Sequence, residues 1–104
     1  MSGCLGVHPA TKVLGEDIKA QTVQALNNLR AIVTESGSSI QDVVKTTIYL
    51  TDLNDFATVN GIYSAFFSEQ CPVGAILPAR TTIQISKLPL GASIEIEAIV
   101  KNAS

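Results

Sequence analysis

The sequence is poor in the side chains that build metal sites and disulfide scaffolds. It has two cysteines, Cys4 and Cys71, and one histidine, His8, in 104 residues. The cysteines are far apart and form no C-x-x-C pair, which excludes a disulfide-rich fold and leaves no metal-ligand cluster. We therefore expect each cysteine to be an ordinary buried or half-exposed thiol, and His8 to lie exposed in a loop.

Charged residues are also few. They make up 15% of the chain, against 46% hydrophobic residues. Such a composition leaves too few charges to cover a small sphere, so we expect part of the surface to be hidden in an oligomer. The net charge is −2, and the seven basic residues are scattered. Because no basic stripe could follow a phosphate backbone, a nucleic-acid partner is disfavoured.

Membrane and targeting signals are missing as well. No apolar run approaches the roughly 18 residues that a membrane-spanning helix needs. The N-terminal stretch MSGCLGVHPATK has neither the basic segment nor the apolar core of a signal peptide. The length fits one domain over residues 1–104, with no internal repeat or low-complexity linker. We expect a cytoplasmic, reducing location, with the mitochondrion as the alternative.

Two segments have the periodicity of amphipathic helices. Over residues 17–36, apolar side chains recur every three or four positions, with Asp17 as the expected N-cap and Gly37 as the left-handed residue that ends the helix. The second predicted helix covers residues 55–69, with Asp55 as its cap. The inward side chains are expected to include Ile18, Leu26, Leu29 and Ile32 in the first helix, and Phe56, Val59, Ile62 or Tyr63, Phe66 and Phe67 in the second.

Three segments have the composition or alternation of strands. Residues 43–50 are rich in β-branched side chains, and residues 80–86 and 92–100 alternate strictly. In the last segment, Glu95 and Glu97 share a face that must meet water, a ligand or another subunit, while aliphatic side chains occupy the opposite face. The Pro- and Gly-containing stretch QCPVGAILPA is predicted to be a connection. The order of elements predicts an α+β fold, with two helices on one face of a small mixed sheet.

Arg80 and Glu95 are unusual because each places a charge in apolar, strand-like sequence. Buried charge is costly unless it is paired or used. From the residues alone, Arg80 can be interpreted as one half of a strand-end ion pair, and Glu95 as a solvated or interface carboxylate. Asn60 can likewise be interpreted as a side chain that bonds the backbone near a helix end.

Several long blocks of the sequence resemble the RidA/YjgF/UK114 proteins, also called L-PSP. These blocks are SG at 2–3, QTVQALNNLRAIV at 21–33, DVVKTTIYLTDLNDFATVNGIY at 42–63, PAR at 78–80 and LPLGASIEIEAIV at 88–100. Their spacing matches too, and the resemblance covers essentially the whole chain. It implies a chorismate-mutase-like α+β fold and a homotrimer with active sites in clefts between subunits.

The same resemblance implies hydrolytic deamination of reactive 2-imino and enamino acids, such as 2-iminobutanoate and 2-iminopropanoate, to 2-keto acids and ammonia, without a metal or cofactor. Arg80 matches the family arginine that binds the substrate carboxylate, and Glu95 matches the glutamate that orients and deprotonates the attacking water. Asn60, Gly3 and Thr82 match positions that line the substrate-binding cleft. Thr82 stands where the family often has cysteine.

The chain departs from the family pattern at its start, where relatives carry a first hairpin and a tyrosine that covers the ligand. We therefore expect one or two strands to be absent and a sheet edge to be exposed. The stretch CPVGAIL also makes the connection before Pro78 longer than usual.

Two alternative functions stay open. One is a non-catalytic module that binds a small carboxylate through Arg80. The other is the endoribonuclease or translation-inhibitor activity assigned to some relatives. The pI near 5.2 and the single histidine count against it, because in-line RNA cleavage by histidine acid/base chemistry needs a pair.

Overall fold

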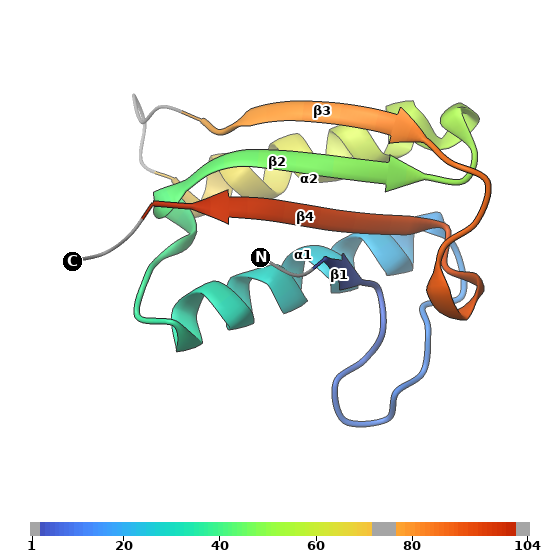
Figure 1. Ribbon diagram of the computed structural model, residues 1–104, viewed down its shortest axis with the longest axis horizontal. Helices are drawn as coiled ribbons and strands as arrows, with labels where there is room; N and C mark the ends of the chain where they lie inside the picture. The colour runs from blue at the N-terminus through green and yellow to red at the C-terminus, as the bar shows by residue number, and fades with distance from the viewer. Residues whose placement is uncertain (1–2, 72–76, 102–104) are drawn as a thin grey trace.

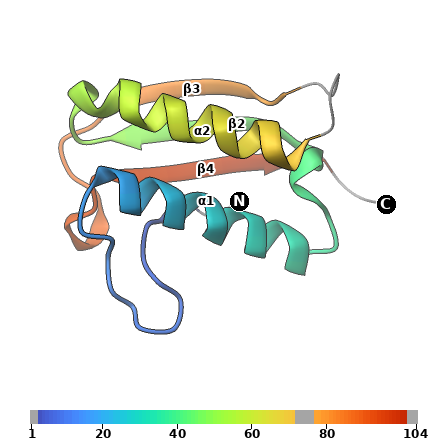
Figure 2. The ribbon, with the colours of Figure 1, turned by 180° about the vertical axis from the view of Figure 1, so that it is seen from behind.

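The protein folds as a sheet with two helices on one face, and the predicted α+β arrangement is confirmed. The computed structural model describes residues 3–71 and 77–101. The sheet has the strand order β1-β4-β2-β3; β2 and β3 are parallel, and β4 is antiparallel to both β1 and β2 (Figure 1). Both helices cover the same face, as Figure 2 shows from behind. The elements are β1 Cys4–Leu5, α1 Ile18–Glu35, β2 Val43–Leu50, α2 Phe56–Gln70, β3 Ala79–Gln84 and β4 Ile94–Val100.

Local signals placed most of these boundaries correctly. The Asp17 carboxylate accepts a hydrogen bond from the Ala20 backbone N–H at 2.8 Å and so caps α1. Gly37 follows the helix with a φ of +88°, which a glycine adopts without strain. Asp55 is the N-cap residue of α2, as predicted, but its side chain makes no capping hydrogen bond. A short 3-10 turn leads into α2, and Asp52 caps that turn by accepting from the Asn54 N–H at 2.9 Å.

The core fills the space between the sheet and the two helices. Its largest fully buried side chains include Leu26, Leu29, Ile48, Leu50, Val59, Phe67, Ile94 and Ile96. Two side chains expected to face inward are instead exposed, Ile32 by 39% and Phe56 by 41%. Both lie toward the lateral borders of the helical layer: Ile32 lines a hollow beside β1, and Phe56 lies near Arg80 of the edge strand β3. Helical periodicity predicts a face of a helix but not where the sheet beneath it ends.

The short edge strand β1 was not predicted. Cys4 and Leu5 pair with Ile96 and Glu95 of β4, so among the described residues most of β4 has no partner strand on that side. This agrees with the expected exposed sheet edge. The Asn28 amide, from α1, donates to the backbone carbonyls of Leu5 at 3.0 Å and Val7 at 2.8 Å. A helix side chain thereby satisfies part of the edge that a further strand would otherwise pair with.

Two predictions fall on residues outside the described ranges. Ser2 of the SG pair is one. The other is the lengthened connection, of which residues 72–76 are not described. Within the described ranges, neither helix combines the length and apolarity required to cross a bilayer.

Candidate functional site

The five predicted site residues form two groups on opposite faces of the sheet. The first group is Arg80 and Thr82 of β3 with Asn60 of α2. In the parallel register Arg80 pairs with Thr46 and Thr82 pairs with Ile48, and both partners are buried beneath the helices. Arg80 and Thr82 therefore project from the helix-facing side of β3, at the border where α2 stops covering the sheet.

The guanidinium of Arg80 contacts aromatic rings. Its central carbon lies 4.8 Å from the ring centroid of Tyr63 and 6.0 Å from that of Phe56. These rings are two turns apart on α2, and Asn60 lies between them on the same helical stripe. The interpretation of Arg80 as one half of an ion pair is therefore not what the described residues show. Arg80 is also exposed, so its N–H donors are free to meet a ligand.

Asn60 has an unusual feature for a helix residue. Its side-chain oxygen is buried and has no hydrogen-bond partner in the described structure. Most buried polar atoms are paired, because an unpaired one loses its hydration without compensation. The interpretation of Asn60 as a side chain that bonds the backbone therefore does not hold for its oxygen among the described residues. The atom is an unused acceptor about one helical turn from each of the two rings that Arg80 contacts.

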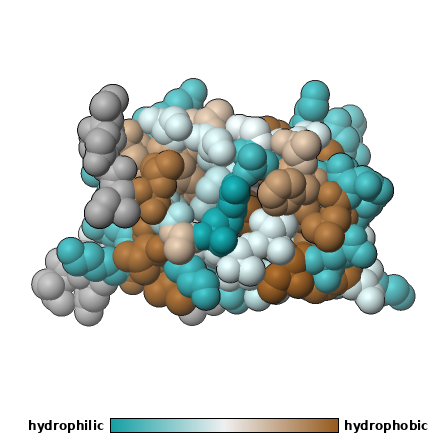
Figure 3. Space-filling view, turned by 90° about the horizontal axis from the view of Figure 1, so that it is seen from above, coloured by the Kyte–Doolittle hydropathy of each residue, from teal (hydrophilic) through white to brown (hydrophobic). Residues whose placement is uncertain are grey.

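A hollow of about 320 Å³ adjoins Arg80. Its walls are formed by Tyr63, Ser64, Phe67, Leu77, Pro78 and Arg80. Figure 3 views the molecule from the β3 side, where apolar patches flank a strongly hydrophilic strip. A cation beside apolar walls suits a small ligand that has both a carboxylate and a short hydrocarbon part.

The second group is Glu95 of β4 with Gly3. Glu95 lies between the buried Ile94 and Ile96, so it projects from the helix-free face, where it is half-buried. A Cβ atom at Gly3 would collide with the Glu95 carboxylate, lying 2.7 Å from Cδ. Glycine at position 3 therefore lets the backbone approach that carboxylate closely.

Two titratable neighbours of Glu95 have raised pKa values. Burial, and secondarily the charge of Glu95, raises the pKa of the Cys4 thiol, so this cysteine stays protonated and is a poor nucleophile. Desolvation and the charges of Glu97 and Glu95 raise the pKa of Tyr49, which stands directly opposite Glu95 in the β2–β4 register. Cys4 and Tyr49 therefore stay neutral, and neither is a candidate general base.

The two groups do not meet within one chain. Arg80 lies on the helix-facing side of β3, Glu95 lies on the helix-free side of β4, and β2 separates the two strands. Neither charge is fully buried in a single chain, since Arg80 is exposed and Glu95 is half-buried. A ligand bound by both side chains would require two copies of the chain.

Sequence reasoning missed the neighbours of these two charges. Tyr63 was assigned to the core only, yet its ring also lies against Arg80. The spacing of Phe56, Asn60 and Tyr63 at positions i, i+4 and i+7 could have predicted that the two rings and the amide share one face of the helix. Tyr49 opposite Glu95 required the strand register, which the sequence does not state.

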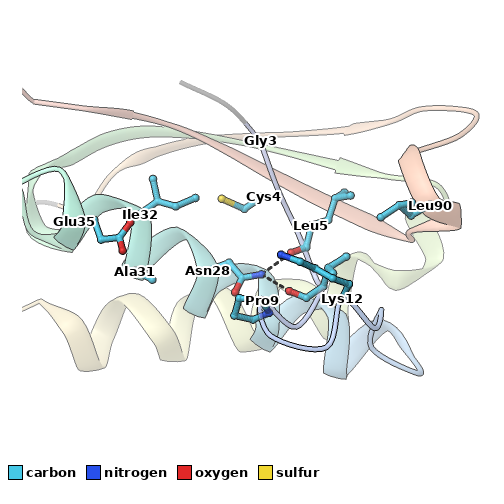
Figure 4. Close-up of a pocket in the computed structure, with 11 residues that line it drawn as sticks. Gly3, Cys4, Leu5, Pro9, Lys12, Asn28, Ala31, Ile32, Glu35 and Leu90 are labelled. Atoms are coloured by element: carbon cyan, nitrogen blue, oxygen red, sulfur yellow. Dashed lines mark hydrogen bonds between the residues drawn. The ribbon is translucent and has the colours of Figure 1, made fainter.

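A larger hollow, of about 500 Å³, lies along the open edge of β1 (Figure 4). Apart from Gly3, no predicted site residue lines it. Cys4, Ile32 and Leu90 supply apolar walls, and the Asn28 amide is already bonded to backbone carbonyls. This hollow therefore belongs to the sheet edge, not to the Arg80 group.

Comparisons with known proteins show what this chain is similar to. The family model described as Endoribonuclease L-PSP matches residues 1–102. The 2-iminobutanoate/2-iminopropanoate deaminase of Salmonella typhimurium is 48% identical over 98 residues, covering 94% of this chain and 74% of that protein. The crystal structure of the YjgF gene product from E. coli has a TM-score of 0.90 at 45% identity, covering 98% of this chain and 78% of that one. E. coli TdcF with bound serine has a TM-score of 0.91 at 40% identity, covering 99% and 79%.

Proposed function

This chain belongs to the endoribonuclease L-PSP family, that of the RidA and YjgF proteins, and we propose that it hydrolyses 2-iminobutanoate, 2-iminopropanoate and their enamine tautomers to 2-keto acids and ammonia. The observation that carries the proposal is the Arg80 group: an exposed guanidinium over the rings of Phe56 and Tyr63, with an unpaired buried amide oxygen on the same helical stripe as the two rings. Relatives 47–48% identical to this chain are named for that reaction.

The reaction needs little chemical assistance. Water adds to the carbon of the C=N bond, and the resulting carbinolamine breaks its C–N bond. The water oxygen becomes the keto oxygen, and its two protons leave with nitrogen as ammonia. Because imines hydrolyse unaided, holding the substrate and one base in place is sufficient for a large acceleration.

The Arg80 group would bind the substrate. A guanidinium offers a planar fork of N–H donors that matches a carboxylate through two charge-assisted hydrogen bonds. Thr82, two positions along the same side of β3, adds a hydroxyl next to that carboxylate. The free Asn60 oxygen would accept a hydrogen bond from the imine nitrogen or from the attacking water.

Glu95 would act as the base, from a second copy of the chain. Because Arg80 and Glu95 lie on opposite faces of one sheet, we infer that each site forms between adjacent subunits of a homotrimer. The helix-free face supports association, since it presents Ile83 and Ile99, 42% and 55% exposed, beside Glu95 and Glu97. Covering this face would remove apolar surface from water.

The direct test measures keto-acid release while a dehydratase generates 2-iminobutanoate in the same solution. The protein is expected to raise the rate above that of spontaneous hydrolysis. The matched control is Glu97→Gln, on the same face of β4, which should retain activity because Glu97 has no role in the proposed site. If a preparation of verified oligomeric state gives no acceleration, the deaminase function is wrong.

A shared site also predicts subunit complementation. Variants lacking only Arg80 or only Glu95 should each be inactive, but co-refolding them in equal amounts should restore about a quarter of wild-type activity, because that fraction of interfaces pairs an intact Arg80 with an intact Glu95. The measurement is keto-acid release before and after mixing. As a control, wild type is co-refolded in equal amounts with a variant that lacks both Arg80 and Glu95, which measures the loss of activity caused by mixing alone. If mixing restores no activity, either both residues act in the same subunit's site or one of them takes no part in the site.

The endoribonuclease activity that the family description names receives no support from His8. Its Nδ1 atom accepts from the backbone N–H groups of Ala10 at 3.2 Å and Thr11 at 3.3 Å, which ties the ring to its own exposed turn. RNA binding measured at increasing salt concentration tests this conclusion, and strong, salt-sensitive binding would contradict it.

A further inference from the structure

Tyr63 is held from two directions where α2 packs on the sheet. The side chain is 6% exposed. Its hydroxyl lies 2.6 Å from the hydroxyl of the fully buried Thr46, and the two share a hydrogen bond. The ring centroid lies 4.7 Å from that of Phe67, in a tilted contact. Because both the hydroxyl and one side of the ring are held, the ring has little freedom to turn.

The same arrangement connects Tyr63 to Arg80 twice. Thr46 of β2 is the register partner of Arg80 on β3, so the strand residue that holds the tyrosine hydroxyl is adjacent to Arg80. The ring then presents its face to the guanidinium, 4.8 Å from the centroid. Burial raises the pKa of Tyr63, against smaller opposite effects of Thr46 and Arg80, so the ring stays a neutral phenol. Phe56 offers only a more distant and more exposed ring.

We propose that Tyr63 is a positioning residue for carboxylate binding: its ring, fixed by Thr46 and Phe67, holds the Arg80 guanidinium in the orientation that receives the substrate. The inference rests on the proposed function, since the carboxylate is that of the imino acid. An exposed arginine otherwise samples many rotamers, and ordering it on binding lowers affinity. A ring face attracts the cation while leaving its N–H donors available for the ligand.

The central test replaces the ring. Tyr63→Leu is expected to raise the KM for the imino acid, and the dissociation constant of the product 2-oxobutanoate, about fivefold, the order expected when a cation–π contact at an exposed site is lost. The kcat should change much less, because the base is not touched. Tyr63→Phe keeps the ring and should restore binding to within about threefold of wild type. Phe56→Leu, which removes the more distant ring, is the matched control and should have the smallest effect.

A spectroscopic measurement separates positioning from general loss of structure. The Arg80 side-chain protons should show a ring-current shift in wild type and Tyr63→Phe, and the shift should disappear in Tyr63→Leu. If Tyr63→Leu does not fold, Thr46→Val carries the test, since it frees the ring hydroxyl without opening a cavity. It should weaken 2-oxobutanoate binding about two- to threefold, the expected effect of one lost neutral hydrogen bond. Unchanged binding in Thr46→Val would then overturn the proposal.

Arg80→Ala, measured in parallel, distinguishes the two proposals. If Arg80→Ala binds 2-oxobutanoate as tightly as wild type, the proposed function fails at its binding step. If Arg80→Ala loses binding while a folded Tyr63→Leu keeps both its affinity and the Arg80 shift, only the positioning role of Tyr63 is overturned.

Discussion

Replacing Glu95 by glutamine is expected to lower the kcat of imino-acid hydrolysis roughly 10²- to 10⁴-fold, the usual contribution of a positioned general base. Glutamine keeps the size of the side chain and can still hydrogen-bond a water, but it cannot take the proton. The KM should stay near the wild-type value, because the carboxylate of the substrate is bound by Arg80. Steady-state keto-acid release, compared with Glu97→Gln, measures the effect.

This variant also separates an enzyme from a binding module. In a module that only captures a small carboxylate, Glu95 has no chemical task, so Glu95→Gln should leave the affinity for 2-oxobutanoate unchanged and there would be no turnover to lose. In the deaminase, turnover falls while affinity persists. Light scattering on both glutamine variants checks that the helix-free face still associates. A Glu95→Gln protein that turns over as fast as Glu97→Gln would remove Glu95 from the mechanism.

The parts of the fold that were predicted from sequence depend on local interactions. Asp17 and Gly37 mark the ends of α1 through hydrogen bonds and backbone angles set within a few residues. The β-branched run at 43–50 became β2 with those bounds. The alternation in β4 correctly placed Glu95 opposite the aliphatic face, because successive side chains of a strand point to opposite sides.

The parts that were missed depend on residues far apart in the chain. The two-residue strand β1 exists because Cys4 and Leu5 reach β4, and its own sequence carries no strand period. In β3 the alternating residues are polar on the helix-facing side, because α2 does not cover that edge. The sequence therefore could not show that the Arg80 guanidinium contacts a ring of α2, while Glu95 projects from the opposite face of the sheet. That separation is a property of the strand order β1-β4-β2-β3.

Removing the other half of the site should have a comparably large effect on binding. Arg80→Ala is expected to lower kcat/KM roughly 10²- to 10³-fold, because two charge-assisted hydrogen bonds to the carboxylate are lost together. Arg80→Lys keeps the charge but not the planar fork, so it should recover only part of the loss. The dissociation constant of 2-oxobutanoate, measured by calorimetry, should rise in the same order: wild type, lysine, alanine.

The fold gives this prediction a sharp control. Arg80 is exposed, and the contacts that the described structure shows for its guanidinium are the faces of Tyr63 and Phe56. A cation–π contact at such a site stabilises the protein by only about 0.5–1 kcal/mol, so Arg80→Ala should unfold close to the wild-type temperature. Lost activity at nearly unchanged stability would mean that the arginine serves the ligand. A large drop in melting temperature would instead mean that Arg80 holds β3 against α2, and the loss of activity would then follow from the loss of structure.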